Sequence, residues 1–268
     1  MSAPVLILCY HAVSDEWPAQ MAVTRQRFEE QLRLLVGRGY RGATFTEAVL
    51  APPHRRTLAV TFDDGFRSVL EHAAPVLREL GLPGTIFVPT DLIGLGRAMQ
   101  WHGVGDWRRS GHASELVPLE WDELRALAAE GWEIGSHTRT HPRLLMLADD
   151  ALAEELGESR SRLERELGAP CRSLAYPFGE ADARVIEAAR AAGYEAAGGL
   201  PTSFRKVSPL AWPRTGVWRS DGPFSFRLKV SSGVVALQRS SAFRRLDRPR
   251  RAVKRLLRPG SIKRPWLD

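Results

Sequence analysis

Cysteine is scarce in this chain: Cys9 and Cys171 are the only two among 268 residues. Two thiols cannot build the disulfide framework of a small secreted domain, and Cys9 lies within an apolar run. We therefore expect reduced thiols and a cytoplasmic location. Long apolar runs are lacking too. No stretch of 18 apolar residues occurs, so the sequence predicts no membrane-spanning helix.

The first ten residues also lack the marks of a signal peptide. They contain no basic stretch, and their apolar core runs straight into His11 without a small-residue cleavage site. We expect a buried first strand there instead. The rest of the composition, with 44% hydrophobic and 26% charged residues, is ordinary for a globular protein, and the length allows one large α/β domain.

Positive charge is concentrated at the end of the chain. Residues 239–268 hold 11 of the 38 Lys and Arg but only 2 of the 31 Asp and Glu, which leaves 27 basic and 29 acidic side chains elsewhere. Apolar residues alternate with these charges roughly as in a basic amphipathic helix. Peripheral contact with an anionic membrane and a plain solvated end are the two interpretations we favour. Nucleic acid is the weakest, and we expect no such partner.

Apolar runs typical of strands alternate with amphipathic runs typical of helices. This order predicts parallel strands joined by helical crossovers, and the number of units favours a distorted, TIM-like (β/α) barrel of seven or eight strands in residues 1–225, with residues 226–268 as a basic extension. The predicted strands are 5–9, 58–62, 84–88, 132–135, 172–176 and 195–198. The predicted helices are 24–38, 46–50, 68–80, 120–130, 148–167 and 181–192.

Three short strings follow predicted strands, where barrels carry their reactive groups. Asp63 and Asp64 end the run 58–62, and two histidines, His137 and His141, follow the run 132–135. One carboxylate with two imidazoles is a common set of ligands for a divalent metal, and it leaves the second carboxylate free to act on water. Taken singly, Asp-Asp-Gly is as typical of a turn, and paired histidines are as typical of a surface. Together with the third string, Tyr176-Pro177-Phe178-Gly179, they predict metal-assisted hydrolysis.

These strings resemble the first three motifs of the polysaccharide deacetylases, the NodB-homology or carbohydrate esterase family 4 proteins, over roughly residues 5–220. The resemblance implies a distorted (β/α) barrel with one divalent ion, most often Zn²⁺, with Co²⁺ or Ni²⁺ as alternatives. It implies Asp63 as general base and a backbone N–H of the Tyr176–Gly179 turn as oxyanion donor. It further implies substrate or oxyanion contacts from Tyr176, Pro177 and Phe178, and metal ligation by Asp64, His137 and His141. Trp218 lies outside these motifs, four residues after Arg214, and could line the acetyl pocket or pack in the core.

Two departures from the family pattern concern the base and the acid. Many members carry an arginine two residues before the proline of the third motif, where this chain has Ala175. Arg172 and Arg214 are the candidate replacements, and we favour Arg214. The family's late Leu-x-His string is also missing, because no histidine follows His141.

An early string takes the place of that late one. Leu8-Cys9-Tyr10-His11 resembles it, as in the circularly permuted branch typified by the deacetylases of poly-N-acetylglucosamine. The resemblance makes His11 the general acid. The alternative is a histidine that merely ends a strand. The aromatic residues Trp101, Trp107 and Trp121, with His102, could equally stack on sugar rings or pack in the core.

The sequence therefore predicts a metal-dependent hydrolase that removes the acetyl group from an N-acetylhexosamine in a glycan or lipid-linked sugar. Three alternatives stay open at this point: an O-acetyl esterase, an amide hydrolase with a non-sugar substrate, and an inactive module that binds glycan or membrane.

Overall fold

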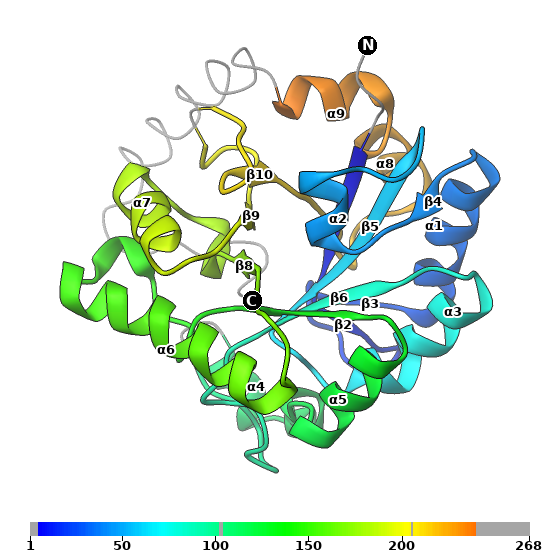
Figure 1. The fold of residues 1–268 in the computed structure, drawn as a ribbon. Coiled ribbons are helices and arrows are strands. Elements are labelled where there is room, and N and C mark those ends of the chain that lie inside the picture. Colours follow the sequence, from blue (N-terminus) through cyan, green and yellow to red (C-terminus); the bar gives the residue numbers. More distant parts are fainter. Residues whose placement is uncertain (1–4, 102–103, 205, 240–268) are drawn as a thin grey trace, which may run out of the picture.

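A curved parallel sheet forms the centre of the molecule (Figure 1). The computed structural model describes residues 5–101, 104–204 and 206–239. All six predicted strands are present and pair in parallel. They are β1 (Val5–Tyr10), β5 (Thr57–Asp63), β6 (Gly84–Val88), β7 (Glu133–Ser136), β8 (Ser173–Ala175) and β9 (Ala196–Gly199).

Two further short strands close the sheet. β10 (Trp212–Pro213) pairs with β9, and β11 (Thr215–Gly216) pairs with β1, so the strand order is β10-β9-β8-β7-β6-β5-β1-β11. Only Arg214 separates β10 from β11, so the two ends of the sheet are joined by a single residue of the chain. This closure confirms the predicted distorted (β/α) barrel. A small strand, β4 (Arg41–Gly42), pairs with β5 outside this path, and β2 (Ala12–Val13) pairs with β3 (Ala22–Val23).

Helices surround the barrel, as Figure 1 shows, near the predicted positions. Thr24 begins α1 by accepting a hydrogen bond from the N–H of Arg27. One prediction needs correction. The run 68–80 is not a single α-helix but a π-helical turn, η1 (Val69–Ala73), followed by α3, because Pro75 has no N–H to continue a regular ladder. The α-helices up to β9 are α1 (Arg25–Gly37), α2 (Phe45–Leu50), α3 (Ala74–Glu79), the short α4 (Gly105–Arg108), α5 (Trp121–Ala129), α6 (Asp149–Leu167) and α7 (Ala183–Ala191).

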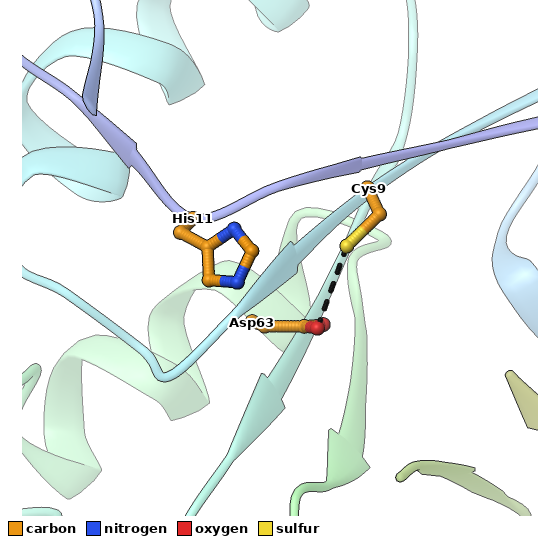
Figure 2. A group of neighbouring side chains, drawn as sticks. All are labelled: Cys9, His11 and Asp63. Carbon is orange, nitrogen blue, oxygen red and sulfur yellow. Dashed lines mark hydrogen bonds between the residues drawn. The ribbon is translucent and has the colours of Figure 1, made fainter. Parts of the chain in front are cut away.

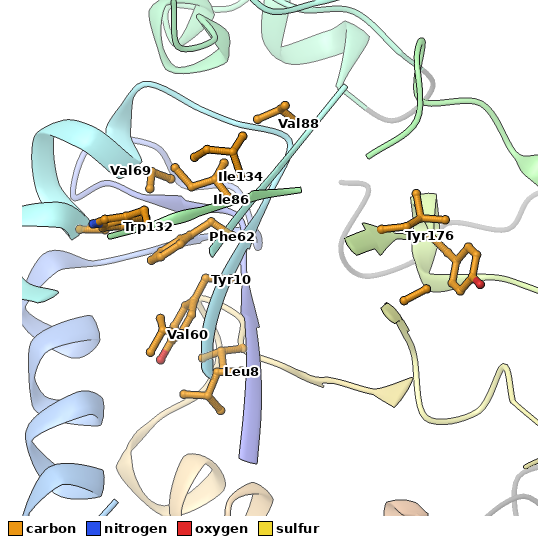
Figure 3. Close-up of a cluster of buried hydrophobic side chains, with 14 of the residues drawn as sticks. Leu8, Tyr10, Val60, Phe62, Val69, Ile86, Val88, Trp132, Ile134 and Tyr176 are labelled. Atoms are coloured by element: carbon orange, nitrogen blue, oxygen red, sulfur yellow. The ribbon is translucent and has the colours of Figure 1, made fainter. Parts of the chain in front are cut away.

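Alternation along the strands divides the core into two layers. On β1, Leu8 and Tyr10 pack outward with Val60 and Phe62 of β5 beneath the helices, as seen in Figure 3. The intervening residues, such as Ile7, face the barrel interior. Because side chains alternate with a period of two, the interior side of β5 ends in Asp63. Helix α2 packs its Phe45 into this inner layer.

The segment after β9 contributes two more helices, α8 (Pro223–Lys229) and α9 (Ser232–Arg239). α8 crosses the predicted domain boundary, and its Phe226 is buried in the main core. Residues 240–268, most of the basic extension, lie outside the described residues, so its role stays a prediction. Among the residues that the structure describes, no helix is long and apolar enough to cross a membrane.

Candidate metal and catalytic site

Three predicted metal ligands meet at the carboxyl ends of β5 and β7. Asp64 follows β5 directly, and His137 follows β7. Oδ1 of Asp64 lies 3.4 Å from Nε2 of His137 and 3.4 Å from Nε2 of His141. All three side chains are buried. The structure therefore brings together the carboxylate and both imidazoles that the spacing predicts.

The separations of these atoms fit a divalent ion. A tetrahedral zinc ion with bonds of 2.0–2.1 Å has ligand atoms roughly 3.3–3.4 Å apart. The two Asp64–histidine separations of 3.4 Å match that spacing, and they are longer than a charge-assisted hydrogen bond of roughly 2.7–2.9 Å. The donor set of Asp64, His137 and His141 therefore fits a divalent metal.

Both imidazoles direct Nε2 toward Oδ1 of Asp64. Nδ1 of His137 donates to the carbonyl oxygen of Ala175 at 2.7 Å, which leaves Nε2 free of its proton for a ligand. Burial lowers the pKa of His141 to about 3, so this ring is neutral at physiological pH. A neutral imidazole is the form that binds a metal.

Backbone strain gathers at the same place. Among the described residues, four that are not glycine have positive φ: Asp64 (74°), Thr138 (69°), His141 (62°) and Phe178 (58°). A branched residue such as Thr138 in this region is a genuine outlier. Three of the four are metal-ligand candidates or lie between them, and Phe178 follows β8 on the same edge of the barrel. Such strain persists where the surroundings impose it, commonly at functional sites.

A buried carboxylate on α6 holds the loop that carries both histidines. Oε2 of Glu155 accepts hydrogen bonds from the backbone N–H groups of Arg139 and Thr140, both at 2.9 Å. Its Oε1 accepts from the hydroxyl of Thr140 at 2.6 Å. The loop between the two ligands is thus attached to one side chain. The sequence analysis missed Glu155, which lies 14 residues beyond His141 and has no motif of its own.

We expect Glu155→Ala to weaken zinc binding by about 10- to 100-fold, because the loop that carries the two histidines loses the hydrogen bonds that orient it. Equilibrium titration with a chromophoric zinc competitor measures the change. Glu154→Ala is the matched control, since Glu154 is exposed on the same helix and pairs with the side chain of Arg139 instead. Equal zinc affinity in the two variants would contradict the role assigned to Glu155.

The second carboxylate, Asp63, is held by an arginine. Nη1 and Nη2 of Arg214 donate to Oδ1 and Oδ2 of Asp63 at 2.6 and 2.8 Å, with only 2% and 4% of these residues exposed. Burial alone would raise the pKa of Asp63, but the charge and the hydrogen bonds of Arg214 hold it below its ordinary value. Asp63 is therefore ionised and fixed in direction.

Of the two arginines that could replace the missing one at Ala175, Arg214 contacts Asp63. Arg172 instead forms an exposed pair with Glu195. Arg214 reaches inward because it joins β10 to β11, and because Gly198 leaves room for it. A Cβ at Gly198 would lie 2.7 Å from Cδ of Arg214.

A pocket opens over these groups. His11 lines it and stacks against Trp218, with ring centroids 5.4 Å apart. Phe178 and Trp101 line it as well, and each ring packs against His141. Of the other singled-out aromatic residues, Trp107 packs on Trp17, Trp121 packs beneath Arg162, and His102 lies outside the described residues.

The turn Tyr176–Gly179 contributes through its backbone. The side chain of Tyr176 is buried in the core, where its hydroxyl donates to the carbonyl oxygen of Leu210, and it is not among the residues that line the pocket. Pro177 has no N–H, while those of Tyr176 and Gly179 donate to Gly198 and Tyr176. Within the described part of the chain, the N–H of Phe178 is the one donor of this turn without an acceptor.

Comparisons with known proteins agree with this geometry. The family model for polysaccharide deacetylase matches residues 51–197. The YxkH protein of Bacillus subtilis is 26% identical over 198 residues, which cover 72% of this chain and 63% of that protein. A poly-beta-1,6-N-acetyl-D-glucosamine N-deacetylase of Staphylococcus aureus is 23% identical over 171 residues, covering 59% of this chain and 54% of that one. The chain thus spans less than two thirds of the length of these relatives.

Solved structures share the fold. The Streptococcus pyogenes deacetylase PplD superposes with a TM-score of 0.70 at 20% identity, covering 86% of this chain and all of that one. IcaB from Ammonifex degensii gives a TM-score of 0.67 at 24% identity, with coverage of 89% and 98%. The family model matches more than half of the sequence, and its motifs carry the buried Asp and His cluster. The chain therefore belongs to the polysaccharide deacetylase family.

Proposed function

We propose that this protein is a metal-dependent deacetylase that hydrolyses the acetamide of an N-acetylhexosamine in a glycan or lipid-linked sugar. The observation that carries the proposal is that two adjacent carboxylates, Asp63 and Asp64, have different partners. Asp64 lies at metal-ligand spacing from the imidazoles of His137 and His141. Asp63 instead accepts hydrogen bonds from Arg214 and is not part of this ligand group. Zn²⁺ is the proposed ion, with Co²⁺ or Ni²⁺ as alternatives.

In this proposal Asp63 is the general base. It takes a proton from the water whose oxygen attacks the acetyl carbon, and Arg214 keeps the carboxylate aimed and ionised throughout the neutral pH range. When bound, the divalent ion supplies Lewis-acid chemistry, which acidifies water, polarises the carbonyl and offsets the weak basicity that Arg214 imposes on Asp63. Arg214 is a positioning residue in this scheme.

Two further groups act on the oxyanion and on the leaving amine. The N–H of Phe178 donates to the developing oxyanion, since its neighbours in the turn are already occupied. His11 gives a proton to the amine nitrogen as the C–N bond breaks, which releases acetate and a free amino sugar. Trp218 packs against the His11 ring at a tilt of 30°.

The pocket and the relatives support an N-acetylated sugar. With a volume of about 170 Å³ it is smaller than the roughly 300–1,000 Å³ of sites that enclose a whole ligand, so it suits an acetamido group whose glycan stays outside. The Staphylococcus aureus relative bears the name of a poly-N-acetylglucosamine deacetylase. A cytoplasmic location, contact of the basic extension with an anionic membrane and the absence of a nucleic-acid partner remain part of the proposal.

The direct test is acetate release from purified, zinc-loaded protein. We expect release from N-acetylglucosamine oligomers or glycolipids. A panel that adds O-acetylated sugars and simple acetamides separates the alternatives, because an O-acetyl esterase or a non-sugar amide hydrolase would favour those compounds. Failure to release acetate from any N-acetylated acceptor would contradict the proposal and favour an inactive binding module.

We expect His11→Ala to lower kcat for an N-acetyl sugar by a factor of about 100 to 10,000, because an amine cannot leave without a proton. With an aryl acetate as substrate, kcat should fall far less, because the phenolate leaves without a proton. Comparing the two substrates on the same variant preparation controls for folding and zinc content. Equal losses on both substrates would remove His11 as the acid.

A further inference from the structure

A second group of metal-binding side chains adjoins the first. Cys9, His11 and Asp63 each offer one ligand atom, and these three atoms lie within 4.8 Å of one another. Sγ of Cys9 donates to Oδ2 of Asp63 at 3.4 Å. In Figure 2 the thiol and the imidazole approach the same carboxylate from two sides. None of the three belongs to the Asp64, His137 and His141 set.

The barrel itself imposes this juxtaposition. β1 pairs with β5 so that Cys9 lies opposite Thr61 and Tyr10 opposite Phe62. Because inward positions alternate, Cys9 faces the interior one step below His11, and Asp63 ends the inward row of β5. Continued register brings His11 opposite Asp63. All three line the pocket, so an ion can reach them from solvent.

The deacetylation scheme uses the carboxylate and the imidazole but gives the thiol no task. Zinc binds thiolate, imidazole and carboxylate groups, and a thiolate among them favours softer divalent cations such as Cd²⁺. Zinc bonds of about 2.3 Å to sulfur and 2.1 Å to oxygen would set these atoms roughly 3.6 Å apart, close to the observed 3.4 Å. Nδ1 of His11 is buried and makes no hydrogen bond within the described chain, so no partner fixes which nitrogen carries the proton.

We propose that Cys9, His11 and Asp63 form a second, weaker site for a soft divalent cation, and that filling it stops turnover. The ion occupies the base and the acid together, while the thiol releases its proton to solvent. Weaker affinity follows from two features. Arg214 places a positive charge on Asp63, and burial disfavours the thiolate form of Cys9. The first site therefore fills first, and the second fills only at excess cation.

Cadmium titration of the protein carrying one equivalent of zinc tests this site. Cd²⁺ bound to a thiolate gives an ultraviolet charge-transfer band, whereas Cd²⁺ exchanged into the Asp64 site meets no sulfur. We expect the band to appear and acetate release to fall with one common midpoint. The band requires no turnover, so it tests the cation site even if the proposed function fails, whereas the inhibition rests on that function.

Cys9→Ser is the decisive variant, since serine keeps a hydrogen-bond donor beside Asp63 but removes the soft ligand. The Cys9→Ser protein should lose the band. Its inhibition, measured relative to its own zinc-loaded rate, should require at least about tenfold more Cd²⁺. Cys171→Ser, which removes the other buried thiol, should keep both responses. No band in the wild-type protein, loss of the band in Cys171→Ser, or unchanged inhibition in Cys9→Ser would each overturn the proposal. If the melting temperature of Cys9→Ser differs from that of the wild-type protein, Cys9→Ala takes its place in the test.

Discussion

Replacing Asp63 with asparagine lowers kcat/KM for acetamide hydrolysis by a factor of about 100 to 10,000, the contribution expected of a general base. Asparagine retains the shape of the carboxylate and an oxygen that can accept from Arg214, but it cannot take a proton from water. Zinc affinity should change little, because Asp63 is not in the Asp64 set. Acetate release under zinc saturation, together with zinc titration, measures both quantities.

The stability of this variant must be controlled, because Asp63 and Arg214 form a buried ion pair. Leaving one buried charge without its partner costs about 3–5 kcal/mol of unfolding free energy. The double variant Asp63→Asn/Arg214→Met removes both charges and should recover part of the melting temperature but none of the activity. Wild-type turnover by either folded variant would show that Asp63 is not the base.

Replacing the proposed metal ligand His141 with alanine should abolish tight zinc binding and lower kcat/KM by about 1,000-fold or more, since a Lewis acid supplies several kcal/mol of transition-state stabilisation. Metal content after desalting and acetate release measure the two effects. His54→Ala is the matched control, because His54 is exposed and precedes β5 at the opposite end of the barrel. A zinc-free His141→Ala protein with full activity would contradict a metal-dependent reaction.

The succession of the six main strands along the chain and the candidate metal ligands could be predicted from sequence because each signal is local. Asp63 and Asp64 end an apolar run, and the two histidines follow another within six residues. The nearly continuous apolar runs that bury both faces of β1 and β5 are likewise short-range patterns. These features need only that parallel strands present their carboxyl ends together.

The contacts that support the ligands could not be read this way, because barrel closure creates them. The family resemblance favours Arg214 beside Asp63, but no local pattern does, because Arg214 lies 151 residues from Asp63 along the chain and its two-residue flanking strands are too short for a periodic signal. Glu155 is one acid among many on an amphipathic helix until the His137–His141 loop packs on it. The position of Cys9 beside Asp63 depends on register between strands, which the composition of neither strand reveals.

The reaction that we propose for these groups is zinc-dependent removal of an acetyl group from an N-acetylated sugar. Its most direct test is acetate release from an N-acetylglucosamine oligomer by chelator-stripped protein as zinc is added back. We predict no release without metal, a rise that is complete at one equivalent of zinc, and no rise in the His141→Ala protein. Release by the stripped protein, or none at any zinc level, would contradict the account.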